Sequence, residues 1–423
     1  MPARRFVLLA LVAGGSVALV LTHPLALHPA STELDDGTLD CFQFTWNLWW
    51  MRVSLLDLHA NPFFTRHLFF PSGVSLLFHT LSASLGLASL PLQLVLPGGA
   101  VTAHNVLVIA APALIVLTTG LLAREVTGDP WAALAAGLMA AITGAVVWFL
   151  PVIYLTSTYL VAAVLWAWWR LHHHRRPGDI ALVLLLLLAL VFASQEYAMM
   201  ALALLVLDTA ARLFAPRVLG LPAPWIRGLV ATWALAALGL GALAMVAGRN
   251  PRAEPPVGQV LLGSGFLLGF VTRSDPAFPF WMVFYVGTAP ILLVATTAWL
   301  AGRRAVFWTL ASLAMLLMAC GPFVGLHHPL FVEGASASPD LHTVPPGFVR
   351  GPYWLVYHLV PLVRVFRGVY RWVAVAEIAL AVLAATGIAA LRARLPRTGA
   401  RRFVTAVILA LTVGLEPACT GAR

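Results

Sequence analysis

Apolar runs, separated by short polar or basic segments, occupy most of the 423 residues of this chain. Many of the runs approach the roughly 20 residues that an α-helix needs to cross a bilayer. The pattern therefore predicts about eleven membrane-spanning helices, the first over residues 6–21. The later predicted spans cover residues 101–122, 131–150, 154–169, 180–193, 197–214, 228–247, 280–300, 305–324, 372–391 and 403–415.

Residues 45–58 depart from this uniformly apolar pattern. Their large apolar side chains recur at three- and four-residue steps, which places them on one helical face: Trp46, Trp49, Trp50, Val53 and Leu56. A tryptophan-rich face is typical of a helix in the headgroup region of a membrane, and a helix packed within a soluble loop is the alternative. Asn61-Pro62 predicts the end of this helix, and Pro71-Ser72-Gly73 predicts a turn.

Residues 75–96 are long enough to cross a membrane, but Pro91 and several serines and glycines interrupt them. The arginine clusters decide between the alternatives, because basic residues favour the cytoplasmic side. If residues 75–96 do not cross, the later arginine clusters all lie inside, and if they cross, most of the clusters lie outside. We therefore predict an external or re-entrant element here, within a first external loop over residues 23–100.

The N-terminus is predicted to be cytoplasmic, because Arg4 and Arg5 precede the first apolar run. The same run also resembles a signal peptide, with His28-Pro29-Ala30 as the candidate end. We prefer an uncleaved first helix, because a membrane protein with many later spans does not need a removable signal.

The composition defines the class of protein. Hydrophobic residues make up 61% of the chain and charged residues 10%, which excludes a water-soluble domain of this size. We predict an all-α polytopic protein of a cell inner or plasma membrane, organised as one transmembrane domain over residues 1–423. The net charge of +10 comes from arginines clustered between apolar runs, so we expect it to set topology and expect no nucleic-acid partner.

The stretch from Glu33 to Asp40 is unusually acidic. Four of the 16 carboxylates fall within eight positions there, directly after the first predicted span. They are therefore expected at the membrane surface, in the first external loop. Carboxylates deprotonate hydroxyl groups and hold divalent cations, so this loop is the first candidate for a reaction centre.

Ser194-Gln195-Glu196-Tyr197 separates two short apolar segments, which predicts a hairpin of helices with its tip below the outer surface. Glu196 would then be an ionisable group near membrane depth. Such groups cost several kcal/mol unless they are paired or hydrated, so Glu196 is a candidate functional residue. A carboxylate exposed at a helix cap is an equally weighted alternative.

Two more external loops are predicted over residues 248–279 and 325–371. The second ends with Arg364, Arg367 and Arg371, which share one face if this stretch is helical. They lie at the outer mouth of a predicted span, where the positive-inside rule does not place arginines. Guanidinium forks suit phosphate oxygens, so we expect an anionic head group or a diphosphate here, with pairing to loop carboxylates as the alternative.

No glycine-rich phosphate loop, GxSxG or HExxH motif is present, and the three cysteines have no metal-binding spacing. Several short motifs nevertheless resemble the GT-C superfamily of polytopic glycosyltransferases, most closely the bacterial and archaeal members related to the mannosyltransferase and YfhO-like groups. The motifs are Asp40 with Trp46 and Trp49-Trp50, Asn61-Pro62-Phe63, Phe70-Pro71-Ser72-Gly73, and Phe366-Arg367-Gly368-Val369-Tyr370-Arg371-Trp372. The resemblance is strongest before Thr80 and over residues 364–387.

The resemblance implies transfer of a sugar from a polyprenyl-phosphate lipid to a glycan, lipid or protein acceptor at the outer face of the membrane. It implies that Asp40, with Asp35 or Asp36 as the rival, acts as a base or as the ligand of a divalent cation such as Mg²⁺ or Mn²⁺. The candidate substrate-binding residues are Arg364, Arg367, Arg371, Glu196 and His79.

The chain departs from the family pattern in two ways. Asp40 has no adjacent acidic partner, and the sequence ends at Arg423, where many relatives continue into an external domain. We therefore expect that C-terminal domain to be lacking, which leaves acceptor recognition open. A lipid or solute transporter and a lipid-binding relative without turnover are alternatives. A transporter predicts internal repeats and charges buried mid-span, whereas no repeat is visible and most charges lie at span ends.

Overall fold

The computed structural model describes residues 1–34, 40–77, 79–248, 254–271, 285–330, 341–396, 399, 407 and 408. Nearly all regular structure in these residues is α-helix, with two short pairs of antiparallel strands. The chain forms two compact units. Unit 1 contains Met1–Thr118, Phe149–Leu202 and Pro224–Arg252, and unit 2 contains Thr119–Trp148, Ala203–Ala223 and Ala253–Arg423.

Helix length and composition identify a membrane protein. In the described part of the chain, four helices are long and apolar enough to cross a bilayer: Ala3–Leu21, Ala100–Thr127, Gln195–Phe214 and Val369–Arg394. Apart from the 23-residue helix Ile226–Gly248, the other apolar helices are shorter, so helix length and composition together support four spans where the sequence predicted about eleven. The predicted span over residues 403–415 falls almost wholly outside the described residues, and the one over 280–300 does so in part.

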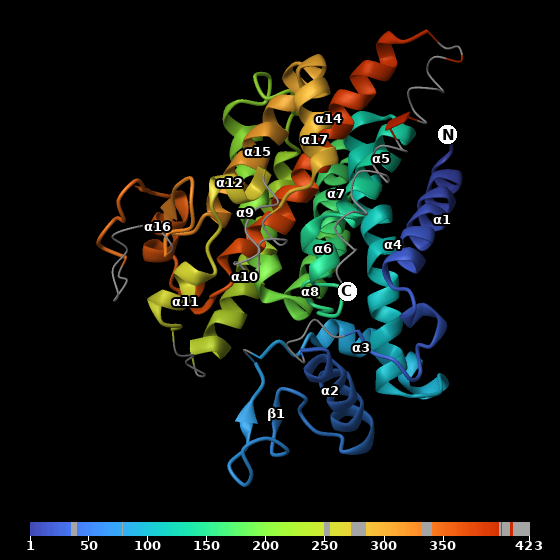
Figure 1. The fold of residues 1–423 in the computed structure, drawn as a ribbon, viewed down its shortest axis with the longest axis vertical. Coiled ribbons are helices and arrows are strands. Elements are labelled where there is room, and N and C mark those ends of the chain that lie inside the picture. The colour runs from blue at the N-terminus through green and yellow to red at the C-terminus, as the bar shows by residue number, and fades with distance from the viewer. Residues whose placement is uncertain are drawn as a thin grey trace. The chain divides into compact units, whose positions relative to one another are not determined.

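The first predicted loop is bounded by two of these long helices. α1 (Ala3–Leu21) ends and α4 (Ala100–Thr127) begins within two residues of the predicted loop boundaries. Figure 1 shows α2, α3 and β1 gathered at the end of α4 where that helix begins. The elements between α1 and α4 are η1 (Leu25–Leu27), α2 (Asp40–Arg52), a π-helical turn η2 (Val53–Asp57), β1 (Phe64–Thr65), β2 (Val74–Ser75) and α3 (Ala83–Val95).

The loop has a small hydrophobic core of its own. Trp50 and Met51 of α2 are buried there together with Leu76, Leu81 and Ala83, and the half-buried Trp46 and Trp49 pack against them. The rings of Trp46 and Trp50 are stacked, with centroids 6.0 Å apart. The predicted helix is thus present, although it begins at Asp40, and its tryptophan face packs against the loop itself. A position in the headgroup region stays a prediction.

The turn predicted at Pro71-Ser72-Gly73 is confirmed. It connects the antiparallel strands β1 and β2, in which Phe64 faces Ser75 and Thr65 faces Val74. Gly73 has a positive φ of 75°, and a Cβ atom there would lie only 2.6 Å from the carbonyl oxygen of Thr65. Glycine is therefore required at this position.

The segment predicted to be external or re-entrant forms the 13-residue helix α3, with Pro91 inside it. At a rise of about 1.5 Å per residue, this helix covers about 20 Å, less than the roughly 30 Å of a hydrocarbon core. Its length therefore supports the prediction that residues 75–96 do not cross the membrane.

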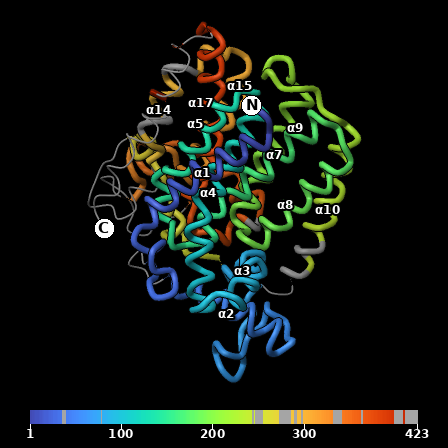
Figure 2. The backbone as a smooth tube through the Cα atoms, turned by 90° about the vertical axis from the view of Figure 1, so that its right-hand side faces the viewer, coloured from blue at the N-terminus to red at the C-terminus, as the bar shows by residue number. Residues whose placement is uncertain are grey.

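The remaining helices of unit 1 begin and end within five residues of the predicted spans. They are α7 (Thr158–His174), α8 (Pro177–Ala193), the start of α9 (Gln195–Phe214) and α10 (Ile226–Gly248). α8 packs against both α7 and α10, as Figure 2 shows. The predicted break between two short helices is also present, because α8 ends at Ala193 and Ser194 has extended backbone angles.

Unit 2 contains one predicted span that is wrong. Residues 131–150 form two helices, α5 (Pro130–Ala141) and α6 (Gly144–Trp148), instead of one. The break falls at Ile142-Thr143, where two β-branched residues precede a glycine, a combination that disfavours a helix. At the other end of α5, the Asp129 side chain accepts hydrogen bonds from the backbone N–H groups of Trp131 and Ala132.

α17 (Trp372–Arg394) is the packing centre of unit 2. It contacts α15 (Arg303–Ala319), α5, α14 (Thr288–Thr297) and η3 (Ala298–Ala301), and its side chains are almost all buried from Trp372 to Ile388. α15 ends earlier than the predicted 324, because Gly321 has a positive φ of 76° and Pro322 follows it. The other elements are α11 (Val257–Leu262), α12 (Leu267–Val271), β3 (Phe323–Val324), β4 (Val349–Arg350), α16 (Pro352–Leu359), η4 (Pro361–Val365) and η5 (Val369–Arg371).

The close approach of α1 and α4 in unit 1 generates the first prediction. A Cβ atom on Gly14 would lie 2.8 Å from the Cα atom of Ala113 and 3.1 Å from its carbonyl oxygen. Gly14→Val must push the two helices apart, so we expect it to lower the free energy of unfolding by about 1–3 kcal/mol. Thermal unfolding in detergent measures this loss.

Gly15→Val is the matched control, because a Cβ atom on Gly15 meets nothing within 4 Å. It introduces the same side chain into the same helix and should leave the unfolding temperature nearly unchanged. Equal losses for the two variants would show that helix propensity, not the contact with α4, sets the cost.

Candidate functional site

Two carboxylates of the acidic stretch, Asp40 and Glu33, lie at the first turns of α2. Asp40 is half-buried in the first turn of this helix, where the helix dipole favours a negative charge. Glu33 approaches the next turn, because the Thr45 hydroxyl donates a hydrogen bond of 2.6 Å to its Oε1 atom. The other two acidic candidates, Asp35 and Asp36, lie outside the described residues.

The start of α2 belongs to a closed ring of contacts within unit 1. The Oδ1 atom of Asn47 in α2 lies 3.1 Å from the Nε2 atom of His79, which is hydrogen-bond distance. Two residues before His79, the carbonyl of Leu77 accepts a 2.9 Å hydrogen bond from Gln195 at the start of α9. These two bonds join α2 to α9 through Leu77 and His79.

The other half of the ring runs through residues 149–157, which connect α6 to α7. The Tyr197 hydroxyl, in the first turn of α9, donates a 2.8 Å hydrogen bond to the carbonyl of Leu155. The adjacent ring of Tyr154 lies against Phe44 of α2, with centroids 5.3 Å apart. Asp40, His79 and Glu196 therefore lie on three segments that this ring of contacts joins to one another.

The structure shows the surroundings of two of these three candidates. His79 is half-buried, and its imidazole contacts Asn47, whose Nδ2 atom in turn donates to the Thr80 carbonyl. His79 and Thr80 are thus fixed against α2. Glu196 is half-buried in the first turn of α9, and it lies between Gln195 and Tyr197, the two residues that anchor α9 to the ring, so its functional role stays a prediction.

His104 is a residue that our sequence reasoning missed. It lies in the second turn of α4 and is fully buried. Neither ring nitrogen has hydrogen-bond geometry with any described residue, although Asn105 and the Pro151 carbonyl lie near, and Glu33 interacts with the ring electrostatically. An ionisable side chain inside a predicted span is itself a signal of function, and that signal was present in the sequence.

Asn105 shows why Glu33 occupies this position. Its Nδ2 atom donates hydrogen bonds to the carbonyls of Pro29 and Thr32, at 2.7 Å and 2.6 Å. These bonds tie the segment before Glu33 to the start of α4. Glu33, Thr45 and His104 are thus brought together by α2 and α4, and the group combines a carboxylate with a buried imidazole.

The described residues give no metal-binding cluster, since no three His, Cys, Asp or Glu side chains converge within them. Glu33 and Asp40 provide at most two carboxylates at the start of α2. A Mg²⁺ or Mn²⁺ ion favours oxygen ligands in nearly octahedral geometry and is often held by one or two carboxylates together with substrate phosphate. Glu33 and Asp40 alone do not define such a site.

The three distal arginines do not lie on one helical face, which corrects the prediction. Arg364 belongs to the 3₁₀ turn η4 and Arg371 to the 3₁₀ turn η5, while Arg367 lies in the connection between them. Phe366, with ψ of 127°, is extended and interrupts the helix. A spacing of three and four residues aligns side chains only in a continuous α-helix.

The three guanidinium groups also differ in their surroundings within unit 2. Arg364 donates to the carbonyls of Tyr357 and His358, at 3.0 Å and 3.1 Å, and lies 3.8 Å from the Glu254 carboxylate. The Arg371 guanidinium is half-buried and lies 5.7 Å from the Tyr370 ring. Arg367 is exposed and makes no hydrogen bond or ion pair with the described residues. Arg367 is therefore the arginine that is best able to bind an anion.

His328 follows α15 and β3 in unit 2 and is buried, with its Nδ1 atom accepting a 3.3 Å hydrogen bond from the Leu330 backbone. Burial lowers the pKa of His328 from 6.5 to about 4, although the backbone of Leu262 and Ser264 opposes this change. The unfolded chain therefore binds this proton at a higher pH than the folded protein does. Stability is full above about pH 6.5 and falls as the pH drops toward 4.

This difference gives a pH-dependent prediction. His328→Asn keeps an acceptor near the position of Nδ1 but does not titrate, so the unfolding temperature should fall less steeply between pH 6.5 and 4. His327→Asn changes the exposed neighbouring histidine and should keep the wild-type slope. If both variants keep that slope, His328 does not contribute to acid sensitivity.

No family model, curated protein or solved structure matches this chain in the comparisons with known proteins. The class that the fold defines is an all-α membrane protein. The case for a function therefore rests on the side chains of the two units.

Proposed function

We propose that this protein is a glycosyltransferase of the GT-C type, with about eleven spans, that transfers a sugar from a polyprenyl-phosphate lipid to an acceptor hydroxyl at the outer face of the membrane. The observation that carries the proposal is the closed ring of contacts around the start of α2. It supports a shared site for a carboxylate base and for the other candidate residues of unit 1.

The reaction requires a base. A bond forms between the acceptor oxygen and the anomeric carbon, while the bond between that carbon and the phosphate oxygen breaks. A carboxylate takes the hydroxyl proton as the acceptor attacks. Asp40 is the proposed base, because it is half-buried in the first turn of α2, where the helix dipole supports its negative charge.

The reaction also requires a group that stabilises the leaving polyprenyl phosphate. Charged donors aimed at a developing anion supply such stabilisation. We propose that Arg367 donates hydrogen bonds to this phosphate, since its guanidinium group is exposed and has no partner among the described residues. Because the donor is a lipid, a membrane protein can bind it without a nucleotide-binding loop.

Asp40→Asn tests the proposed base. It is nearly isosteric and removes the charge, so turnover should fall by the roughly 10²–10⁴-fold typical of a lost general base. Glu33→Gln should have a smaller effect, because the glutamine keeps a side-chain oxygen that accepts the hydrogen bond from Thr45. The measurement is sugar transfer by the purified full chain with a panel of polyprenyl-phosphate-linked sugars.

Asp57→Asn is the matched control for Asp40→Asn. Asp57 is exposed at the other end of the same helical segment and is paired with Arg52 at 3.4 Å, so its loss should leave transfer unchanged. If Glu33→Gln abolishes transfer and Asp40→Asn does not, the base is Glu33 and the reaction class stands. If the unmodified protein transfers no sugar from any donor, a lipid-binding or transport role replaces this proposal.

Arg367→Lys tests the proposed hydrogen bonds from Arg367 to the phosphate of the lipid donor. Lysine keeps the positive charge but loses the planar fork that binds two phosphate oxygens at once. We expect a raised KM for the lipid donor, by roughly tenfold for the loss of one charge-assisted hydrogen bond. Arg364→Lys is the comparison variant, and its effect should appear in thermal stability, because Arg364 holds two backbone carbonyls. An unchanged KM in Arg367→Lys would remove Arg367 from the donor site.

A further inference from the structure

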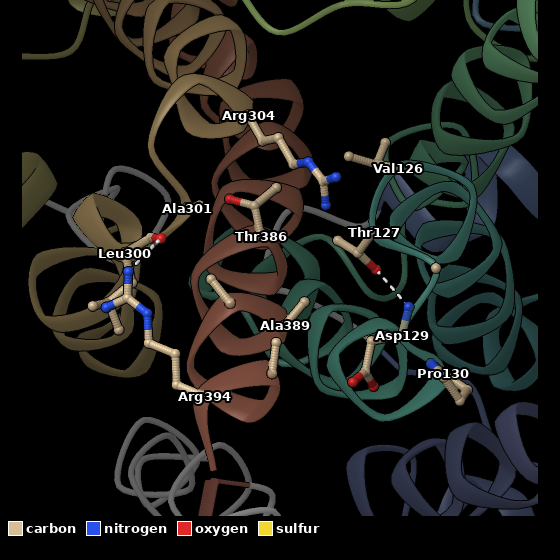
Figure 3. A pocket seen from close by; sticks show the side chains of 13 residues that line it. Val126, Thr127, Asp129, Pro130, Leu300, Ala301, Arg304, Thr386, Ala389 and Arg394 are labelled. Atoms are coloured by element: carbon tan, nitrogen blue, oxygen red, sulfur yellow. Dashed lines mark hydrogen bonds between the residues drawn. The ribbon is translucent and has the colours of Figure 1, made fainter.

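Unit 2 contains a cavity of about 560 Å³ at the ends of three of its elements. The cavity is lined by the last residues of α4, the turn before α15 and the last turns of α17 (Figure 3). Three alanines of α17 leave room for a ligand: Ala389, Ala390 and Ala393. All of these residues belong to unit 2, so the cavity is defined within one compact body.

The lining of the cavity is positively charged. Arg304 and Arg394 contribute two guanidinium groups, and Asp129 contributes a carboxylate. The charge of Asp129 is already compensated, because its Oδ2 atom accepts a 2.9 Å hydrogen bond from Arg392. Its Oδ1 atom accepts two backbone N–H groups of α5. The cavity therefore presents positive charge that the described residues do not neutralise.

Arg304 is the group best placed to bind a ligand. Figure 3 shows its side chain extending toward Val126 and Thr127 on the α4 side of the cavity. It makes no hydrogen bond or ion pair with the described residues. It also lies in the first turn of α15, whose N-cap residue Gly302 has no side chain to cap the helix. The positive end of that helix dipole adds to the attraction for an anion.

Arg394 is different, because it is already bound. Its Nη2 atom donates a 3.4 Å hydrogen bond to the carbonyl of Leu300, and its guanidinium carbon lies 6.0 Å from the centre of the Trp299 ring. Thr127 and Thr386 are also occupied, since their hydroxyls donate to the carbonyls of Ala123 and Leu383. Arg304 is therefore the main determinant of binding in this cavity.

The position of the cavity favours a lipid ligand. α4 and α17 are both apolar enough to cross a membrane, and the cavity is lined by the C-terminal ends of the two helices. Helix ends of this kind lie at the level of lipid head groups, and basic pockets between membrane helices bind anionic head groups. A phosphate diester also matches the planar fork of an arginine.

We propose that this cavity is a binding site for the phosphate of an anionic phospholipid, with Arg304 as its main ligand. The proposal does not depend on the transfer reaction proposed for the protein. The alanines of α17 accommodate the glycerol part of the lipid, and the guanidinium group of Arg304 donates to the phosphate oxygens.

Native mass spectrometry of the full chain in detergent tests this site, with phosphatidylglycerol as the probe. Arg304→Gln should weaken binding by roughly tenfold or more, as expected for the loss of a charge-assisted hydrogen bond. Arg303→Gln is the matched control, because Arg303 is the adjacent exposed arginine and does not line the cavity. Equal losses in the two variants would mean diffuse surface attraction and would overturn the proposal.

Ala389→Leu provides a second test that leaves Arg304 in place. Ala389 is half-exposed in the cavity wall, so a larger side chain occupies the space of the lipid. We expect weaker binding of phosphatidylglycerol at an unchanged unfolding temperature of the lipid-free protein. Wild-type binding by this variant would show that the lipid does not enter the cavity.

Two further probes identify the source of the phosphate. Phosphatidylcholine should bind more weakly than phosphatidylglycerol, because its choline group brings a positive charge to a positive cavity. Inorganic phosphate at millimolar concentration should not displace phosphatidylglycerol, since it lacks the glycerol contacts. Equal binding of the two lipids, or full displacement by phosphate, would overturn the assignment to an anionic phospholipid.

Discussion

The ion pair between Asp129 and Arg392 holds the ends of two helices of unit 2 together. Arg392 is buried near the end of α17, and an unpaired buried charge costs several kcal/mol. Asp129 removes that cost and also caps α5 with two hydrogen bonds. One carboxylate therefore fixes where α5 begins and how it meets α17, which is the helix that the rest of unit 2 packs around.

In unit 1, no single interaction defines the candidate site. Single hydrogen bonds or ring contacts join segments that are distant in sequence: the start of α2, Leu77 with His79, the start of α9, and residues 149–157. Each of these contacts is weak, at about 1 kcal/mol. Because they form a closed ring, the loss of one contact leaves every segment attached through another.

The apolar pattern predicted most of the helices well, because long hydrophobic runs allow only helices in a membrane. The ends of α1 and α8 fall within three residues of their predicted positions, whereas α4 continues five residues beyond its predicted end. The break between α5 and α6 was not predicted, since hydrophobicity does not register two β-branched residues before a glycine. Helix length was also overestimated where an apolar run continues through a turn, as it does between α15 and β3.

The candidate site was predictable only in part. The acidic character of the first loop is evident in the sequence. The sequence also identified Asp40, His79 and Glu196 as candidate residues. The pairing of Glu33 with Thr45 and the approach of His104 depend on how α2 meets α4, and a sequence pattern does not contain that information. The three arginines were placed on one face because a helix was assumed where two 3₁₀ turns occur.

The late start of α7 constrains the length of the connection between α6 and α7. A helix that began at residue 154, as predicted, would have used the Leu155 carbonyl for its own backbone ladder. Because α7 begins at Thr158, that carbonyl is left for the Tyr197 hydroxyl. Insertion or deletion of one residue between Phe149 and Ser157 would move this acceptor out of register. This short, buried connection should therefore not tolerate changes in length.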